Sequence, residues 1–589
     1  MRILEANISL SAADFFIKEL KNISVIEKAN ELLEIKCGIK SFFLDESELI
    51  ELKEKLTLTF SSVEEPDRAE YGDFQTNRLL ANQVAALLHE KGINPDIIIE
   101  PTCGKGNFLI ASLSNFNEIK QIIGIEIYKP YVWETKFNIL DFYIKNPQTN
   151  KPDIEIFHFN VFDFDFKKLS SQFNNHNLLI IGNPPWVTNS QLGSLNSNNL
   201  PQKSNFKNKN GLDAITGKGN FDIAEYITLS LFDAFQNLNG NLALLVKNSV
   251  IKNIVFDQKI NQYRIGSIEK HSIDSKKEFG VSVESSLFYC KLNTNPEFEC
   301  KAYNFYNKNN MLSFGWVNNK FVSNTANYLY TKSIDGNCPF EWRQGIKHDC
   351  SAVMEFGKIN GDYVNNLNEK VEIEDELVYG LLKSSDLKNT VINETRKYTI
   401  VTQNKVGQET NYIRHQFPAT YQYLNKHLQI FQSRKSSIYK GKPLFSIFGI
   451  GDYSFKPYKV AISGLYKTFH FTLVLPQNNK PVMLDDTCYF IGFENLEFAV
   501  YSIILLNSPH TEKLLKSITF SDAKRVFTKD VLMRIDLLKL SKTCLMQYVE
   551  KQIQLMNIKY GFNIELNLWD RFIKEMAPVK EKQMTIFGN

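Results

Sequence analysis

The sequence lacks the long apolar stretches that would place it in or across a membrane. Its 589 residues contain no run approaching about eighteen apolar residues, the length that a membrane-spanning helix needs. The first residues also lack the basic segment followed by an apolar one that is typical of a signal peptide. We therefore expect no membrane association and place the chain in the cytoplasm.

Paired cysteines and charge of one sign are lacking as well. None of the eight cysteines forms a Cys-x-x-Cys pair, so their spacing fits no zinc site and indicates reduced thiols. The formal net charge is only +3, so a polyanionic partner would have to be bound by local basic clusters. The sequence also has no convincing acidic strand motif of the kind that holds metal ions in nucleases. We expect no bound metal and no fused nuclease.

Helices and strands alternate from about residue 75. The segment 77–92 has the period of an amphipathic helix closed by Gly92, and short apolar runs typical of buried parallel strands follow it. These runs cover 95–101, 121–127, 153–159, 176–186 and 241–249, with a further strand at 283–292 and helices at 106–115 and 219–238. The alternation predicts an α/β fold with a parallel sheet.

The flanking parts of the chain differ from this central region. Residues 1–65 carry short acidic helical segments, and after about residue 330 the sequence mixes short strands, aromatic-basic loops and a late helix. We expect an N-terminal extension (1–65), an α/β catalytic domain (66–330), a second domain (331–575) and a tail (576–589). Residues 188–220 are polar and rich in asparagine, which predicts a long loop that is either functional or disordered.

A strand, a glycine turn and a helix follow one another in Ile97–Phe108. Gly104 and Gly106 allow the backbone to turn tightly and approach a ligand, and the helix that follows offers free N–H groups. Glu126 ends the next strand about twenty residues later, where a carboxylate suits the two hydroxyls of a ribose. These features predict a cofactor that contains a nucleoside; the alternative is a Rossmann-like strand with a surface glutamate.

The tetrad Asn183-Pro184-Pro185-Trp186 directly follows an apolar strand. The exocyclic amine of an aromatic base is a poor nucleophile because its lone pair is delocalised into the ring. The side-chain oxygen of Asn183 and the backbone oxygen of Pro184 can accept its two hydrogens and return the lone pair to nitrogen, while the prolines fix the backbone. Trp186 offers a flat face for stacking the base. The tetrad indicates methyl transfer to a planar nitrogen; the alternative is a turn that contains two prolines.

The cofactor loop, Glu126 and the tetrad together resemble the gamma-type N6-adenine DNA methyltransferases of bacterial restriction-modification systems. That family places the cofactor loop first, the tetrad second and a target recognition domain last, and this chain keeps the order, with motif-level similarity over about residues 65–300. The resemblance implies a Rossmann-like methyltransferase sheet with helices on both faces and a C-terminal α+β target recognition domain. It also implies transfer of a methyl group from S-adenosylmethionine to adenine N6 in double-stranded DNA, with the base flipped out of the duplex.

The resemblance further implies which residues contact the cofactor. The segment before the first strand would lie over its methionine end, although Asn77 stands where the family usually has proline. Asn160, with Asp163 nearby, takes the place of an acidic residue near the cofactor's adenine, and Asp222 is either close to the cofactor or a helix N-cap. The full set of implied cofactor contacts is Gln75, Thr76, Asn77, Glu100, Pro101, Thr102, Gly104, Gly106, Phe108, Glu126, Ile127, Asn160, Val161 and Asn183.

A catalytic set follows from the same resemblance. Phe279 matches the aromatic residue that stacks on the flipped base, with a core aromatic at a strand start as the alternative. The implied catalytic residues are Asn183, Pro184, Pro185, Trp186 and Phe279.

Basic and aromatic residues interleave at 434–467, which predicts a DNA-facing surface; the alternative is a face that is merely solvated. The residues are Arg434, Lys435, Lys440, Lys442, Lys456, Lys459 and Lys467, with Asp452 as the single acid. The segment 522–525 is a second candidate for phosphate contact. The loop 188–220, with Lys203, Lys207, Lys209 and Lys218, is predicted to close over the flipped base or the DNA backbone, or else to be solvated.

Further partners and functions stay open in the sequence. A cognate restriction endonuclease is one expected partner. Residues 583–587 resemble a peptide that binds a sliding clamp, or form a tail that only packs or frays. The tetrad also serves methyl transfer to RNA guanine or to a protein glutamine amide, although the protein enzymes are much shorter. A non-catalytic DNA-binding protein with a methyltransferase fold is the last alternative, which the intact tetrad and glycine loop disfavour.

Overall fold

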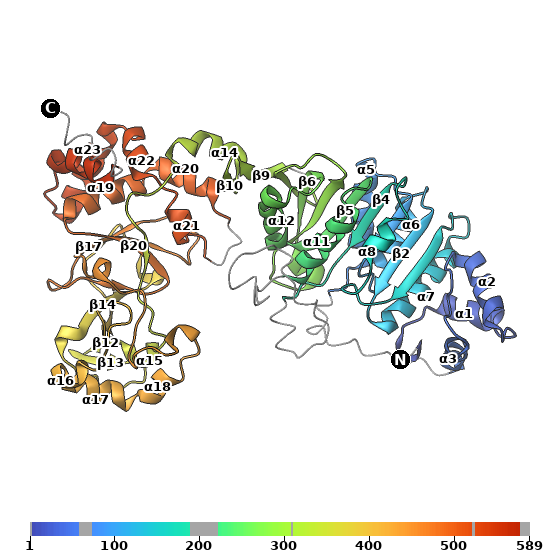
Figure 1. The fold of residues 1–589 in the computed structure, drawn as a ribbon, viewed down its shortest axis with the longest axis horizontal. Helices are drawn as coiled ribbons and strands as arrows, with labels where there is room; N and C mark the ends of the chain where they lie inside the picture. The colour runs from blue at the N-terminus through green and yellow to red at the C-terminus, as the bar shows by residue number, and fades with distance from the viewer. Residues whose placement is uncertain (1–2, 58–73, 189–221, 308–309, 521–524, 578–589) are drawn as a thin grey trace. The chain divides into compact units, whose positions relative to one another are not determined.

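The computed structural model describes residues 3–57, 74–188, 222–307, 310–520 and 525–577. The chain forms two compact units, Met1–Phe321 and Val322–Asn589, which are described separately (Figure 1). Within the described residues, no helix has the length and apolar character needed to cross a membrane. All eight cysteines are free and buried.

The first unit is built on one ten-stranded sheet with the order β10-β9-β8-β6-β7-β5-β4-β1-β2-β3. The strands are β1 (Ile97–Glu100), β2 (Gln121–Glu126), β3 (Asp153–His158), β4 (Leu178–Gly182), β5 (Gly240–Lys247), β6 (Ile265–Ile273), β7 (Ser285–Leu292), β8 (Glu299–Asn304), β9 (Asn310–Val317) and β10 (Lys320–Val322). Strands β1 to β5 pair in parallel, whereas β7 runs antiparallel to both β5 and β6. The sheet therefore begins as the expected parallel sheet and continues as a mixed one.

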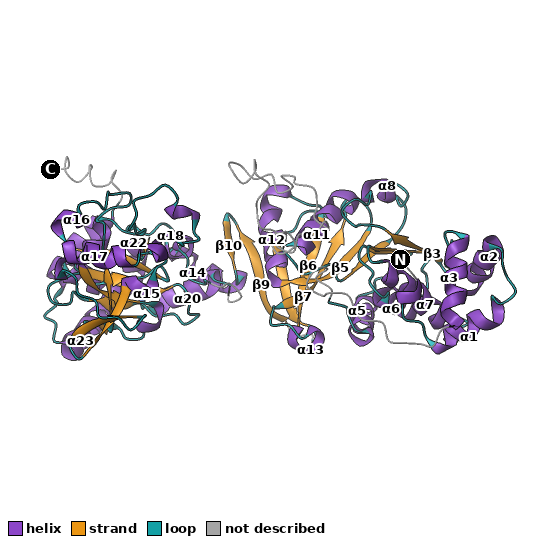
Figure 2. Ribbon diagram, turned by 90° about the horizontal axis from the view of Figure 1, so that it is seen from below, coloured by secondary structure: helices purple, strands orange, loops and turns teal. Residues whose placement is uncertain are grey.

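Helices cover both faces of this sheet. The described helices of the first unit are α1 (Leu10–Glu19), α2 (Ile26–Cys37), α3 (Glu46–Thr57), α5 (Arg78–Glu90), α6 (Asn107–Asn115), α7 (Lys129–Lys145), α8 (Phe166–Ser170), α11 (Ile223–Phe235), α12 (Asn248–Asn261) and α13 (Ser275–Phe279), with the short 3-10 helix η1 (Ile3–Glu5). Helices α5, α6 and α7 lie on one face, and α8, α11 and α12 on the other (Figure 2). Because both faces are covered, β1 and β4 are buried at every position. The expected α/β fold is confirmed.

The N-terminal helices α1 to α3 extend the core of this unit. Phe16 and Phe42 pack on Trp133 and Phe137 of α7, with ring centroids 5.8 to 6.4 Å apart. The buried ammonium of Lys136, also on α7, donates to the backbone oxygen of Phe42 at 2.6 Å. Helix α7 is thus enclosed between the sheet and the N-terminal helices.

The second unit contains two five-stranded sheets with the orders β11-β20-β17-β18-β15 and β13-β12-β16-β14-β19. Their strands are β11 (Arg343–Gln344), β12 (Glu355–Ile359), β13 (Asp362–Asn365), β14 (Val378–Leu382), β15 (Val391–Ile392), β16 (Lys397–Ile400), β17 (Tyr458–Ser463), β18 (Thr472–Val474), β19 (Met483–Leu484) and β20 (Cys488–Phe493). The helices are α14 (Thr325–Thr331), α15 (Ser351–Met354), α16 (Ile413–Gln416), α17 (Pro418–Lys426), α18 (Leu428–Gln432), α19 (Leu496–Leu506), α20 (Pro509–Ile518), α21 (Lys529–Leu532), α22 (Leu537–Thr543), α23 (Met546–Tyr560) and α24 (Trp569–Met576). The described residues of this unit also form the short 3-10 helices η2 (Lys332–Ile334), η3 (Asp375–Leu377), η4 (Ser384–Asp386), η5 (Ser437–Tyr439), η6 (Asp452–Phe455) and η7 (Leu566–Leu568). Strands and helices segregate rather than alternate, which is an α+β arrangement.

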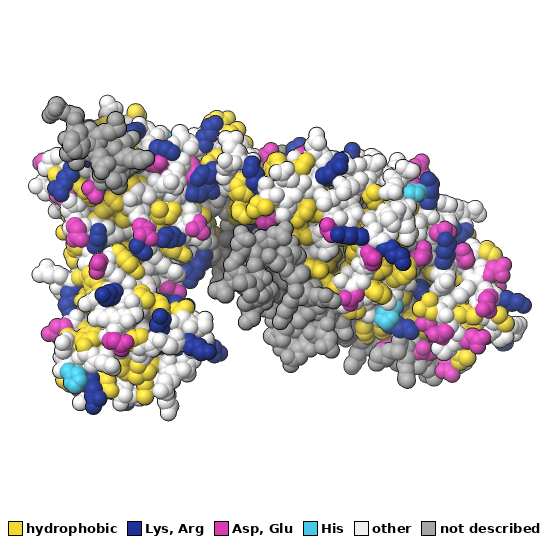
Figure 3. All heavy atoms as spheres, in the orientation of Figure 1, with side chains coloured by type: hydrophobic (Ala, Val, Ile, Leu, Met, Phe, Trp, Pro, Cys, Tyr) yellow, Lys and Arg dark blue, Asp and Glu magenta, His cyan; other side chains and the backbone are white. Residues whose placement is uncertain are grey.

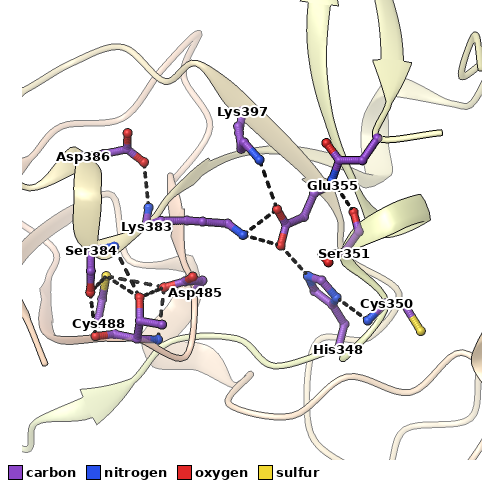
Figure 4. Close-up of polar contacts among 12 residues, drawn as sticks. His348, Cys350, Ser351, Glu355, Lys383, Ser384, Asp386, Lys397, Asp485 and Cys488 are labelled. Atoms are coloured by element: carbon purple, nitrogen blue, oxygen red, sulfur yellow. Dashed lines mark hydrogen bonds and ion pairs between the residues drawn. The ribbon is translucent and has the colours of Figure 1, made fainter. Parts of the chain in front are cut away.

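A buried carboxylate joins several strands of the second unit. The Glu355 side chain accepts from the ammonium of Lys383 at 2.7 Å, and Lys397 lies 3.5 Å away (Figure 4). The Cys350 N–H donates to Nδ1 of His348 at 3.1 Å, so Nε2 carries the ring hydrogen and faces Glu355 at 3.5 Å. Burial alone would raise the pKa of Glu355, but hydrogen bonds from His348 and Lys383 outweigh it and lower the pKa from 4.5 to about 2.

We predict that Glu355→Gln destabilises the second unit by about 2 kcal/mol at neutral pH, because the amide loses the charge-assisted bonds. Since the folded pKa lies below the ordinary value of 4.5, this contribution is present above pH 4.5 and is lost as the pH falls toward about 2. Denaturant unfolding of the wild type and of Glu355→Gln between pH 7 and pH 2 measures the difference in their free energies of unfolding. Glu376→Gln, at an exposed position of the same unit, is the matched control. A pH-independent difference between the two variants would contradict the account.

Candidate active site

A cavity lies at the carboxyl ends of the parallel strands of the first unit. It is lined by the turn after β1, the end of β2, the segment after β3, the tetrad after β4 and residues 74–76 before α5. This edge is where open α/β sheets bind ligands. The cavity brings together most of the predicted cofactor contacts: Gln75, Thr76, Glu100, Pro101, Thr102, Gly104, Phe108, Glu126, Ile127, Asn160, Val161 and Asn183. Asn77 and Gly106 are not among its lining residues.

The two predicted glycines have different roles in the turn after β1. Gly104 has φ +52°, and a Cβ there would lie 2.5 Å from Oε1 of Gln75, so the Gln75 side chain crosses the turn at the cavity wall. Gly106 has φ +77° and precedes α6; a Cβ there would lie 2.8 Å from Cγ2 of Thr135 on α7. Gly104 therefore shapes the cavity, whereas Gly106 allows the turn to pack on α7.

Two carboxylates meet in the cavity wall. The oxygens of Glu126 accept the N–H groups of Gly104 at 2.9 Å and Tyr128 at 2.8 Å, which fixes the carboxylate at the end of β2. Glu100 is 2% exposed, and its Oε2 has no hydrogen-bond partner within the described part of the chain. Burial, and then the nearby charge of Glu126, raise the pKa of Glu100 well above its ordinary value. A positively charged ligand group would offset this cost.

The segment before α5 is held against the turn and the tetrad. The side-chain Nδ2 of Asn107 donates to the backbone oxygen of Thr76 at 2.8 Å, and the backbone N–H of Lys105 donates to Oε1 of Gln75 at 3.3 Å. The backbone oxygen of Phe74 accepts from Nδ2 of Asn183 at 2.7 Å. Sequence reasoning missed Phe74 because it acts through its main chain. The buried hydroxyl of Thr76 has no hydrogen-bond partner among the described residues.

The hydrogen bond from Nδ2 of Asn183 to the backbone oxygen of Phe74 fixes the orientation of the Asn183 side chain. Since Nδ2 donates to Phe74, Oδ1 faces away from that carbonyl; it is buried and has no hydrogen-bond partner in the described ranges. The Thr102 hydroxyl donates to the backbone oxygen of Asn183 at 3.4 Å. Pro184 is buried and Pro185 lines the cavity. The site thus presents an uncharged acceptor of fixed position next to the cavity.

Trp186, the last residue of the tetrad, packs against Phe279. The indole N–H donates to the backbone oxygen of Leu245 at 3.1 Å, and the Trp186 residue is 4% exposed. Phe279 meets it edge to face with centroids 4.8 Å apart, and Phe74 lies 5.5 Å away. Trp186 is therefore buried in this arrangement, and a base could stack on it only after the rings that cover it move.

Comparison with known proteins shows to which family the chain belongs. No protein-family model matches the chain. Over 486 residues it is 41% identical to the type II methyltransferase M.NspV of Nostoc sp. (strain ATCC 29411 / PCC 7524), a match that covers 82% of this chain and 99% of that protein. The chain belongs to the type II methyltransferase family. The expected resemblance to methyltransferases of restriction-modification systems is confirmed at this level.

A solved structure shares the fold of nearly the whole methyltransferase chain. The type IIL restriction-modification enzyme MmeI, solved in complex with DNA, superposes with a TM-score of 0.51 at 12% identity. The match covers 98% of this chain and 93% of that one. At this identity the likeness concerns the fold alone, and it includes both units of the methyltransferase.

Asn160 and Asp222 make local contacts in the methyltransferase, whereas Asp163 does not reach the cavity. Asn160 lines the cavity, and its Oδ1 accepts the N–H of Phe162 at 3.1 Å, whereas Asp163 is exposed and does not line it. Asp222 is the N-cap of α11, accepts the Ala224 N–H at 3.1 Å and pairs with Lys247 at 2.6 Å. The helix-cap interpretation thus describes the contacts of Asp222.

The basic segment 434–467 is only partly available to a ligand. Arg434 donates to the backbone oxygens of Ser446 and Leu444 at 2.8 and 2.9 Å, and Lys459 is fully buried in β17. The prediction of Lys459 as a DNA contact is wrong, because the sequence does not reveal which strand residues point inward, whereas that of the half-buried Arg434 stays a prediction. Lys435, Lys440, Lys442 and Lys467 are exposed. The predicted loop 188–220 (all but Thr188), residues 522–524 and the tail motif 583–587 lie outside the described residues.

We predict that Gly106→Ala destabilises the first unit more than Gly92→Ala does. Both positions have φ near +78°, and an alanine there costs about 1 kcal/mol. A Cβ at Gly92 meets no atom of the described residues within 4 Å, whereas at Gly106 it meets Thr135, which adds about 1–3 kcal/mol of overpacking. Denaturant unfolding of the two variants gives the difference directly, and equal losses would show that the Thr135 contact does not constrain the turn.

Proposed function

We propose that this methyltransferase transfers a methyl group from S-adenosylmethionine to adenine N6 in double-stranded DNA, at a specific site. The observation that carries the proposal is the Asn183 side chain. Its amide nitrogen is bound to Phe74, and its oxygen is buried and has no hydrogen-bond partner among the described residues. An acceptor of this kind suits the N–H of an exocyclic amine.

The cavity fits S-adenosylmethionine in its polar groups and its charge. Glu126 ends β2 with its carboxylate fixed by two N–H groups, and a carboxylate at that place suits ribose hydroxyls. The buried Glu100, with an oxygen that has no hydrogen-bond partner in the described ranges, suits a positively charged ligand. Gln75, Thr76 and Thr102 would face the methionine end, and Ile127, Asn160 and Val161 the adenine. When bound, S-adenosylmethionine supplies an electrophilic sulfonium methyl group.

The tetrad would prepare the adenine nitrogen that receives this methyl group, and that nitrogen would release one proton once the new N–C bond has replaced the sulfonium S–C bond. Asn183 Oδ1 accepts one N–H of the adenine amine, and the backbone oxygen of Pro184 accepts the other. Both bonds strengthen as the nitrogen becomes tetrahedral, so they stabilise the transition state more than the bound substrate. Because Asn183 is neutral, it adds no charge that would stabilise the sulfonium before transfer. Pro184 and Pro185 restrict the backbone that carries these oxygens.

Trp186 of the tetrad and the neighbouring Phe279 hold the flipped base. Trp186 is anchored through its N–H to Leu245, while Phe279 is only half-buried. We assign Trp186 as the fixed wall and Phe279 as the movable one. Extruding the adenine costs a few kcal/mol, which stacking on these rings would partly offset.

The C-terminal unit is the proposed target recognition domain. It exposes Lys435, Lys440, Lys442 and Lys467, which suit contacts to phosphates. Lys and Arg side chains are spread over the visible face of this unit, with acidic side chains scattered among them (Figure 3). As the modification enzyme of a restriction-modification system, the protein would work beside a cognate endonuclease. Transfer to RNA or to a protein amide is the alternative outcome of the test below.

We predict that Asn183→Ala lowers the rate of methyl transfer by at least about a thousandfold, because one of the two acceptors is lost. Binding of S-adenosylhomocysteine changes less than about threefold, since other residues make most of the cavity. Radiolabelled transfer to unmethylated genomic DNA gives the rate, and calorimetry gives the affinity. A variant with a near-normal rate would refute the role of Asn183.

Glu126→Ala is predicted to weaken ligand binding, the property that Asn183→Ala leaves nearly unchanged. Loss of the carboxylate at the end of β2 weakens S-adenosylhomocysteine binding by at least about tenfold. Calorimetry on the variant measures this, with Glu118→Ala, at an exposed position outside the cavity, as the matched control. Equal affinities of the two variants would mean that Glu126 does not contact the ligand.

A further inference from the structure

Two segments about two hundred residues apart are tied together beside the active site. Nδ2 of Asn77 donates to Oε2 of Glu278 at 3.0 Å, and the Tyr306 hydroxyl donates to Oε1 of the same carboxylate at 3.0 Å. The Glu278 side chain is 8% exposed, and Lys277 lies 3.7 Å from it. A carboxylate whose two oxygens both accept hydrogen bonds is held in one position. It holds the residue directly before Phe279.

One end of this tie belongs to the segment that lines the cofactor cavity. Gln75 and Thr76 line the cavity, and Asn77 follows them directly. Oδ1 of Asn77 accepts the Leu80 N–H at 2.8 Å and so caps α5, while its Nδ2 reaches Glu278. One side chain thus fixes the start of α5 and links it to α13. A proline, usual in the resembled family, could make neither bond through its side chain.

The other end of the tie carries the aromatic wall of the base site. Helix α13 is anchored at its start by the Ser275 and Ser285 hydroxyls, 2.7 Å apart. It ends at Phe279, followed by Gly280 with φ +71°. Phe279 lies half-buried against Trp186. The Glu278 contacts therefore fix the end of α13 at which Phe279 lies.

We infer that Asn77 and Glu278 are positioning residues that transmit occupancy of the cofactor cavity to Phe279. Neither lines the cavity, so neither is a catalytic residue. A ligand that contacts Gln75 and Thr76 restrains residues 74–77, and through Asn77 it restrains Glu278 and the adjacent Phe279. By linkage, a base that engages Phe279 would raise cofactor affinity by the same factor. The inference rests on the proposed function in taking S-adenosylmethionine as the ligand and Phe279 as a wall of the base site.

The test is amide hydrogen exchange on the full chain with and without saturating S-adenosylhomocysteine. In the wild type the ligand slows exchange at the cavity segment 100–108 and also at 275–281, which does not line the cavity. Asn77→Ser keeps an oxygen that can cap α5 but has no amide hydrogen for Glu278. In this variant the ligand still protects 100–108, with an affinity within about threefold, while the added protection at 275–281 falls about fivefold.

Two further variants make the test specific. Asn324→Ser makes the same change at the N-cap of α14, in the other unit, and leaves the protection at 275–281 unchanged. In a Glu278→Ala background, adding Asn77→Ser causes no further loss, because both changes remove the same contact.

The outcomes separate the inference from the function on which it rests. Ligand binding without protection of 275–281 in the wild type, or full protection in Asn77→Ser, overturns the coupling and leaves the proposed cofactor in place. No binding and no protection at 100–108 overturns both.

Discussion

The site depends on one hydrogen bond, from the amide nitrogen of Asn183 to the backbone oxygen of Phe74. An asparagine presents either its nitrogen or its oxygen, and only the oxygen can accept from an amine. The Phe74 carbonyl settles the orientation, since it can only accept. The arrangement therefore requires residues 74–76 to lie against the tetrad, which in turn requires Gly104 to leave room for Gln75.

The rest of the first unit holds these pieces at one edge of a sheet. Parallel pairing of β1, β2, β3 and β4 brings four loops together at their carboxyl ends, so residues from separate parts of the sequence share a cavity. Helix α7 supports the turn through Thr135, whose hydroxyl donates to the Gly104 oxygen at 2.8 Å. The N-terminal helices enclose α7 and so stabilise the same turn from behind.

Much of the parallel sheet and of the cavity lining was predictable from sequence, because the patterns that indicate them are local. Apolar runs gave β1 to β5, and the glycine turn, Glu126 and the tetrad each stand in a short motif. Helix α7 was missed because it is buried on nearly all sides, which hides the amphipathic period. Phe74 acts through its backbone, the covering of Trp186 depends on a residue about ninety positions later, and the burial of Lys459 depends on sheet packing. No local pattern encodes these three.

The central claim is that Asn183 and Pro184 accept the two hydrogens of the exocyclic amine of adenine in DNA and so promote its methylation. The most direct measurement is nucleoside analysis of unmethylated genomic DNA after incubation with the protein and S-adenosylmethionine. The account predicts N6-methyladenine as the product, confined to one short sequence. A methylated cytosine, or no methylated nucleoside from a protein that still binds the cofactor, would contradict it.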